Sequence, residues 1–141
     1  MHSVALSGML GTIHGDLRWI FALVALLGIA RAVYGLLRGS DYSHLDARLA
    51  LTYSMLLDLQ ALYGIGLILY LALGKFSLET TVNWIDWHPI WMLAAVAVGH
   101  LGSRWKGAPD RTRFQAQLAI YAASLVLIAV GVLASPLKSW T

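Results

Sequence analysis

Two of the five histidines in this chain stand in matching places, where their rings could hold a metal ion or a haem iron. His14 and His88 each lie at the start of a long apolar stretch. A neutral imidazole can ligate a haem iron axially or bind another metal. Two rings that meet from two helices at one level would form such a site. The alternative is that each histidine caps a helix or lies among lipid headgroups.

His100 is a third candidate ligand, twelve residues after His88. At ~1.5 Å and ~100° per residue, it lies ~18 Å further along the helix and ~120° round it. The two rings therefore cannot serve one iron. No other histidine is expected at the depth of His100. We therefore favour a histidine that hydrogen-bonds a neighbouring helix, and ligation of a second haem is the alternative.

Three further side chains lie close to these histidines along the chain and are candidate contacts of a bound group. Arg18 follows His14 by one turn and suits a haem propionate or a lipid phosphate. Trp91 and Met92 follow His88 by about one turn, where they would contact a ring or pack in the core.

Arg31, Asp58 and Gln60 are polar residues inside apolar stretches. Ionisable side chains at membrane depth are costly and often functional. We predict that Arg31 and Asp58 form an ion pair, which would fix the helix register or serve a proton path, a haem propionate or a quinone. Gln60 points ~200° away from Asp58 and is expected to hydrogen-bond a neighbouring helix or a ligand.

The composition indicates that these residues sit in an integral membrane protein. Of 141 residues, 59% are hydrophobic and only 12% are charged, whereas soluble domains carry about 25% charge. The chain is long enough for about four spans of roughly 20 residues. It has no cysteine, which excludes disulfides, cysteine-ligated zinc and iron–sulfur clusters. The positive net charge of +3 comes from loop residues, so nucleic-acid binding is not indicated.

The pattern predicts an all-α fold, an up-down-up-down four-helix membrane bundle in a single domain over residues 1–141. The predicted spans cover about 17–37, 47–73, 89–104 and 114–137. Asp86 is the expected N-cap of the third span, with Pro89 in its first turn, and Pro136 ends the fourth.

Basic residues predict the orientation of the bundle. The loops after the first and third spans, with their flanking turns, hold seven of them, and the opposite side holds three. Basic loops stay in the cytoplasm, so both termini should lie outside a bacterial inner membrane. The seven are Arg31, Arg38, Arg48, Arg104, Lys106, Arg111 and Arg113, and the three are Arg18, Lys75 and Lys138.

Three motifs resemble a family of small bacterial four-helix membrane proteins known as cytochrome b-like. They are His14-x-x-x-Arg18-Trp19, Gln60 with Gly64 and Leu69-Tyr70, and His88-Pro89-x-x-Met92 with Gly99-His100. The resemblance covers the first three spans and implies that His14, His88 and His100 are haem ligands. Larger b-type cytochromes pair histidines for two haems, whereas only one level here carries two.

These observations leave three functions open. The first is a haem b protein that transfers electrons, with quinol as a candidate donor. The second is a non-catalytic subunit that packs against other membrane subunits of a respiratory or photosynthetic complex. The third is a small transporter or proton conductor that uses Asp58, Arg31 and His100. No hydrolase motif occurs, and the sequence leaves open whether the chain is an enzyme.

Overall fold

The computed structural model describes residues 2–74 and 87–133, and its regular structure is entirely helical within these ranges, as the sequence predicts. The elements are α1 (His2–Arg38), α2 (His44–Gly74), α4 (His88–Gly99), the 3₁₀ helix η1 (His100–Trp105) and α5 (Asp110–Leu133). Four residues named above lie outside the described ranges: Lys75, Asp86, Pro136 and Lys138.

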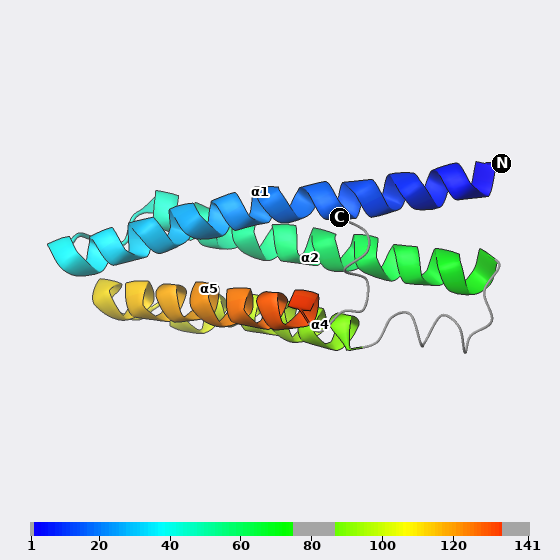
Figure 1. The fold of residues 1–141 in the computed structure, drawn as a ribbon. Helices are drawn as coiled ribbons and strands as arrows, with labels where there is room; N and C mark the ends of the chain where they lie inside the picture. The colour runs from blue at the N-terminus through cyan, green and yellow to red at the C-terminus, as the bar shows by residue number, and fades with distance from the viewer. Residues whose placement is uncertain (1, 75–86, 134–141) are drawn as a thin grey trace.

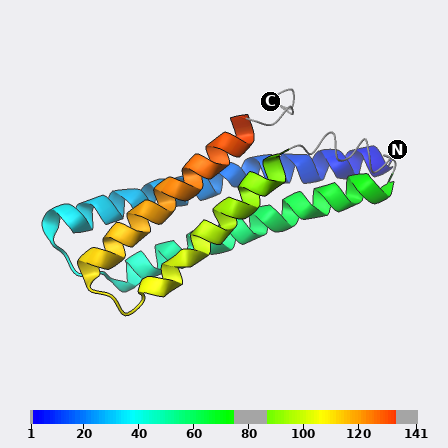
Figure 2. The same ribbon diagram turned by 90° about the horizontal axis from the view of Figure 1, so that it is seen from below.

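The helices α1 and α2 form an antiparallel hairpin, joined by a short turn (Figures 1 and 2). Gly39 has a φ of +61°, a conformation that favours glycine and commonly ends helices. The backbone N–H of Ser43 donates to Asp46 Oδ2 at 2.9 Å, and Ser43 Oγ accepts from the Asp46 N–H at 3.4 Å. This capping box starts α2 at His44, three residues before the predicted span.

The first helix is longer than predicted. α1 has 37 residues, about 55 Å, and begins well before the expected boundary at residue 17. No proline interrupts this segment, so nothing in it forces the helix to start later. His14 therefore lies within α1 and not ahead of it.

A change of helix type divides the predicted third span. The N-cap residue of α4 is Trp87, so the prediction of Asp86 as N-cap is wrong, whereas Pro89 lies in the first turn as predicted. The α-helix ends at Gly99 after 12 residues, and η1 continues for six more. Together they extend about 30 Å, close to the thickness of a bilayer core. α5 then begins at Asp110, four residues before the predicted span.

Small residues of α1 let α5 pack closely against it. A Cβ at Gly28 would overlap the Tyr121 ring, and one at Gly35 would overlap the Phe114 ring. α1 packs on α2 and α5, and α4 packs on α5 and α2. Five buried residues form the hydrophobic core: Phe21, Ala25, Tyr53, Leu57 and Tyr121.

The outside of the bundle is strongly apolar. Three helical segments are long and apolar enough to cross a membrane: Gly11–Arg38, His44–Tyr70 and Asp110–Leu133. Large apolar side chains on them point outward, for example Leu26 (61% exposed) on α1 and Leu62 (66% exposed) on α2. Exposed apolar surface this extensive is unlike that of a soluble monomer.

Candidate functional site

His14 lies on α1, over a glycine of α2. A Cβ at Gly64 would stand 3.5 Å from His14 Cε1, which is van der Waals contact, so the ring packs directly over this glycine. Gln60 Nε2 donates a hydrogen bond to the backbone carbonyl of His14 at 2.8 Å, as expected for Gln60 and a neighbouring helix. His14 Nδ1 and Gln60 Oε1 are buried without a hydrogen-bond partner among the described residues.

His88 is the first residue of α4, and its ring is held by α5. The Nδ1 atom lies 3.1 Å from the carbonyl oxygen of Gly131. A carbonyl only accepts, so the proton of this bond is on Nδ1. In a neutral ring Nε2 is then left with its lone pair. Histidine ligands are commonly oriented by a hydrogen bond of this kind through the other ring nitrogen.

His14 and His88 are close enough to interact electrostatically, although α1 and α4 are not among the helix pairs that pack extensively on each other. Within the described residues, no group of three or more His, Cys, Asp or Glu side chains could hold a metal ion. Structural zinc takes four protein ligands and catalytic zinc three, whereas a haem needs only axial ones.

The three predicted contact residues lie on the two helices that carry these histidines, Arg18 on α1 and Trp91 and Met92 on α4. Arg18 stacks over the Trp19 ring, with its guanidinium carbon 5.2 Å from the ring centroid, and it interacts electrostatically with His14. Met92 and Trp91 pack against Gly131, where a Cβ would overlap both side chains. The same glycine accepts the hydrogen bond of His88, so Trp91 and Met92 help to fix the α5 backbone at this point.

His100 pairs with an aspartate, away from the other two histidines. Its Nε2 lies 2.8 Å from Asp58 Oδ1, and both side chains are about half exposed. This confirms the favoured reading of His100 as a histidine that hydrogen-bonds a neighbouring helix. This bond occupies Nε2, so that nitrogen is not free to ligate a second haem.

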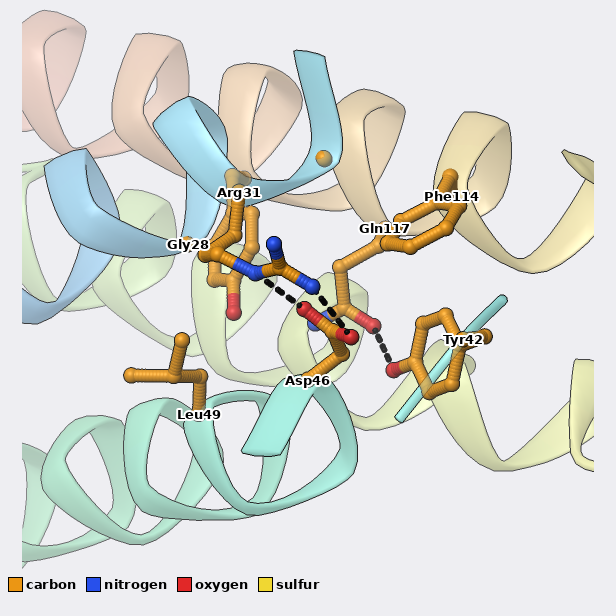
Figure 3. Close-up of a pocket in the computed structure, with 9 residues that line it drawn as sticks. Gly28, Arg31, Tyr42, Asp46, Leu49, Phe114 and Gln117 are labelled. Atoms are coloured by element: carbon orange, nitrogen blue, oxygen red, sulfur yellow. Dashed lines mark hydrogen bonds and ion pairs between the residues drawn. The ribbon is translucent and has the colours of Figure 1, made fainter. Parts of the chain in front are cut away.

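The predicted pairing of Arg31 with Asp58 is wrong. Arg31 binds Asp46 through two parallel contacts, Nε to Oδ1 and Nη2 to Oδ2, each 2.9 Å (Figure 3). Arg31 lies seven residues before the end of α1, and Asp46 is the third residue of α2. Asp58 is twelve residues, or ~18 Å, further along α2. In an antiparallel hairpin it lies far beyond the level of Arg31.

Around this ion pair, a second polar contact ties the interhelical turn to α5. Tyr42 donates a hydrogen bond to Gln117 Oε1 at 2.9 Å (Figure 3). The Arg113 guanidinium stacks 3.7 Å from the centroid of the Tyr42 ring. Burial raises the pKa of Tyr42, although nearby Arg113 opposes this shift. The hydroxyl therefore stays protonated and can donate.

Two buried tyrosines next to this cluster differ in how their hydroxyls are satisfied. Tyr53 and Ser124 share a 2.6 Å hydrogen bond in the core. The Tyr121 hydroxyl is buried without a partner among the described residues, beside a cavity of about 10 Å³ that Asp46 and Gln117 also line. That volume is about the minimum for one water molecule.

Sequence reasoning missed Asp46, Tyr42, Gln117 and Ser124. Asp46 had a readable signal, because Ser43-x-x-Asp46 before an apolar run is a capping box. The other three depend on which faces of the helices meet, and one sequence does not settle that.

Comparison with known proteins finds no matching family model, no matching curated protein and no matching solved structure.

Proposed function

We propose that this chain is an integral membrane protein of the bacterial inner membrane that binds one haem b through His14 and His88 and transfers electrons. The observation that carries the proposal is the state of the two rings. His14 Nδ1 is buried without a partner among the described residues, and His88 is oriented with its Nε2 lone pair available. Two neutral nitrogens that approach from α1 and α4 are the donor set of bis-histidine haem.

The surroundings of the histidines also fit a haem. The small Gly64 lets the His14 ring lie directly over α2, and Arg18, which interacts electrostatically with His14, supplies a positive charge for a propionate. Gln60 holds the His14 backbone and Gly131 holds the His88 ring, so both ligands are positioned by other helices. When bound, the haem would supply reversible one-electron chemistry, and burial and ligand identity would set its potential.

The membrane part of the proposal is an up-down-up-down bundle with four spans, the third formed by α4 and η1 together. The basic turns after α1 and after η1 lie at the same end of the bundle (Figure 1). This arrangement supports a cytoplasmic position for both turns and an outside position for the termini. His14 and His88 would then lie towards the outer surface, where a membrane-soluble quinol is a suitable donor.

A second candidate function is a non-catalytic subunit of a larger membrane complex. It is favoured by Asp58 and His100, which form a half-exposed polar pair on an otherwise apolar surface. Such a pair suits a protein contact better than contact with lipid tails.

The visible spectrum of the purified protein decides between the two functions. Reduced-minus-oxidised α and Soret bands of a low-spin haem, at about one haem per chain, are expected for the first function. Protein that is folded in detergent, expressed with ample haem and free of these bands would overturn it and favour the subunit role.

A further inference from the structure

One face of α2 is not covered by any described part of the chain. Its large apolar side chains recur at helical spacing, three, four or seven residues apart. Their exposed fractions run from 44% to 66%, for Leu51, Met55, Leu62, Ile65 and Leu69. Asp58 lies on the same face, between Met55 and Leu62, and the exposed stripe therefore has a carboxylate at its centre.

The polar pair at the centre of this face is incompletely satisfied. Asp58 is 43% and His100 52% exposed at the side chain, although they bind each other. Among the described residues, Asp58 Oδ2 and His100 Nδ1 make no hydrogen bond. The neighbouring serines do not help, because Ser54 and Ser103 donate to backbone carbonyls. In a bilayer, these free polar atoms would face hydrocarbon, which is unfavourable.

We propose that a second copy of this chain covers the face, in a twofold-symmetric dimer centred on Asp58 and His100. Copies that follow the same topology signals insert in the same direction, so their twofold axis is parallel to the membrane normal. Asp58 and His100 lie at one depth on two neighbouring elements, α2 and η1. Rotation by 180° about an axis beside the pair places the His100 of the second copy opposite Asp58 of the first. By the same rotation, the Asp58 of the second copy lies opposite His100 of the first.

This self-complementarity selects a second copy over another kind of helix. With His100 protonated, both ring nitrogens donate, so the pair presents one acceptor, Asp58 Oδ2, and one donor, His100 Nδ1–H, side by side. The same arrangement rotated by 180° supplies the ring nitrogen opposite the acceptor, and four groups then form a closed set. The apolar stripe on either side would pack against its own copy. The proposal rests on the membrane insertion proposed above and is independent of haem.

Disulfide cross-linking in native membranes tests the dimer, because the chain has no cysteine of its own. Single-cysteine variants Met55→Cys, Leu62→Cys and Leu69→Cys should give a band of twice the chain mass on mild oxidation. Leu26→Cys on α1 and Val126→Cys on α5 are matched controls, because both positions are 61% exposed but lie on other faces.

The outcomes of this test are distinct. Cross-linking confined to the α2 positions supports the dimer. No dimer band, equal bands at the controls, or a band of another mass that shows a different partner would overturn it. Extraction of the unmodified chain from membranes at alkaline pH would instead contradict the membrane insertion itself.

Substitution of the polar pair tests its role in the Leu62→Cys background. Asp58→Leu should lower the dimer yield about three- to tenfold, as expected for loss of polar contacts between membrane helices. The exchange variant that carries both Asp58→His and His100→Asp keeps the self-complementary pattern and should recover much of the yield. An unchanged yield in Asp58→Leu, or no recovery in the exchange variant, would contradict a dimer centred on this pair.

Discussion

The Arg31 guanidinium and the Asp46 carboxylate face each other edge to edge across the α1–α2 hairpin, with both nitrogen–oxygen distances 2.9 Å. Asp46 also accepts hydrogen bonds from the Ser43 backbone and hydroxyl. One carboxylate therefore caps α2 and anchors it to α1. Its side chain is 3% exposed, which makes this the most buried ion pair of the described residues.

Replacement of Arg31 by Met should strongly destabilise the fold. The substitution keeps much of the side-chain volume but leaves the buried Asp46 carboxylate without its partner. The expected loss in free energy of unfolding is about 3–5 kcal/mol. Denaturant unfolding in detergent measures it, with Arg38→Met, an exposed arginine seven residues later, as the control. Equal stability of the two variants would show that the pair contributes little.

Replacement of Gly28 by Ala should also destabilise the bundle, although alanine is the better helix former. The new Cβ would overlap the Tyr121 ring, which is fully buried and has little room to move. Overpacking of this kind costs about 1–3 kcal/mol. A Cβ at Gly66 would meet no atom within 4 Å, so Gly66→Ala should be neutral or stabilising by about 0.5–1 kcal/mol. The same thermal shift in both variants would argue against the close packing of α1 and α5.

The two buried tyrosines should respond differently to loss of their hydroxyls. Tyr53→Phe removes the 2.6 Å hydrogen bond to Ser124 and should cost about 0.5–1.5 kcal/mol. Tyr121→Phe removes a hydroxyl that has no partner among the described residues, and its effect should stay within about 0.5 kcal/mol of zero. Unfolding of both variants under one condition gives the comparison. A larger loss in Tyr121→Phe would mean that a buried water satisfies this hydroxyl.

The helical composition of the fold was predictable because apolar segments of this length leave few alternatives. The boundaries were not. The prediction placed Asp46 in a loop, although Ser43-x-x-Asp46 is a capping box that starts α2 earlier. The change from α-helix to 3₁₀ helix at His100 had no clear signal in the chain.

The candidate site was predicted in part. His14 and His88 lie on α1 and α4, which run in the same direction, and they are close enough to interact electrostatically, but His14 lies twelve residues into α1 whereas His88 begins α4. The ion pair was assigned wrongly because the prediction placed Asp46, the partner of Arg31, in the loop between the first two spans. Gly64 and Gly131 contact the histidines through packing that one sequence does not reveal.

A bulky residue at Gly64 should prevent haem binding. Gly64→Leu would place a bulky side chain against the His14 ring, whereas a Cβ at Gly66 on the same helix would meet no atom within 4 Å, so Gly66→Leu is the control. We expect the haem content per folded chain to fall severalfold in the first variant and to stay unchanged in the second. Similar haem contents in the two variants would place the cofactor elsewhere.

The most direct test of haem ligation by His14 and His88 is the reduced and oxidised visible spectrum of four histidine variants, each compared with the unmodified protein. His14→Ala and His88→Ala should each lose the haem or convert it from low spin to high spin, because each removes one axial nitrogen. His44→Ala, at the first residue of α2, and His100→Ala, whose ring binds Asp58, should keep the low-spin spectrum. An unchanged low-spin spectrum in both His14→Ala and His88→Ala would contradict haem ligation by these two histidines.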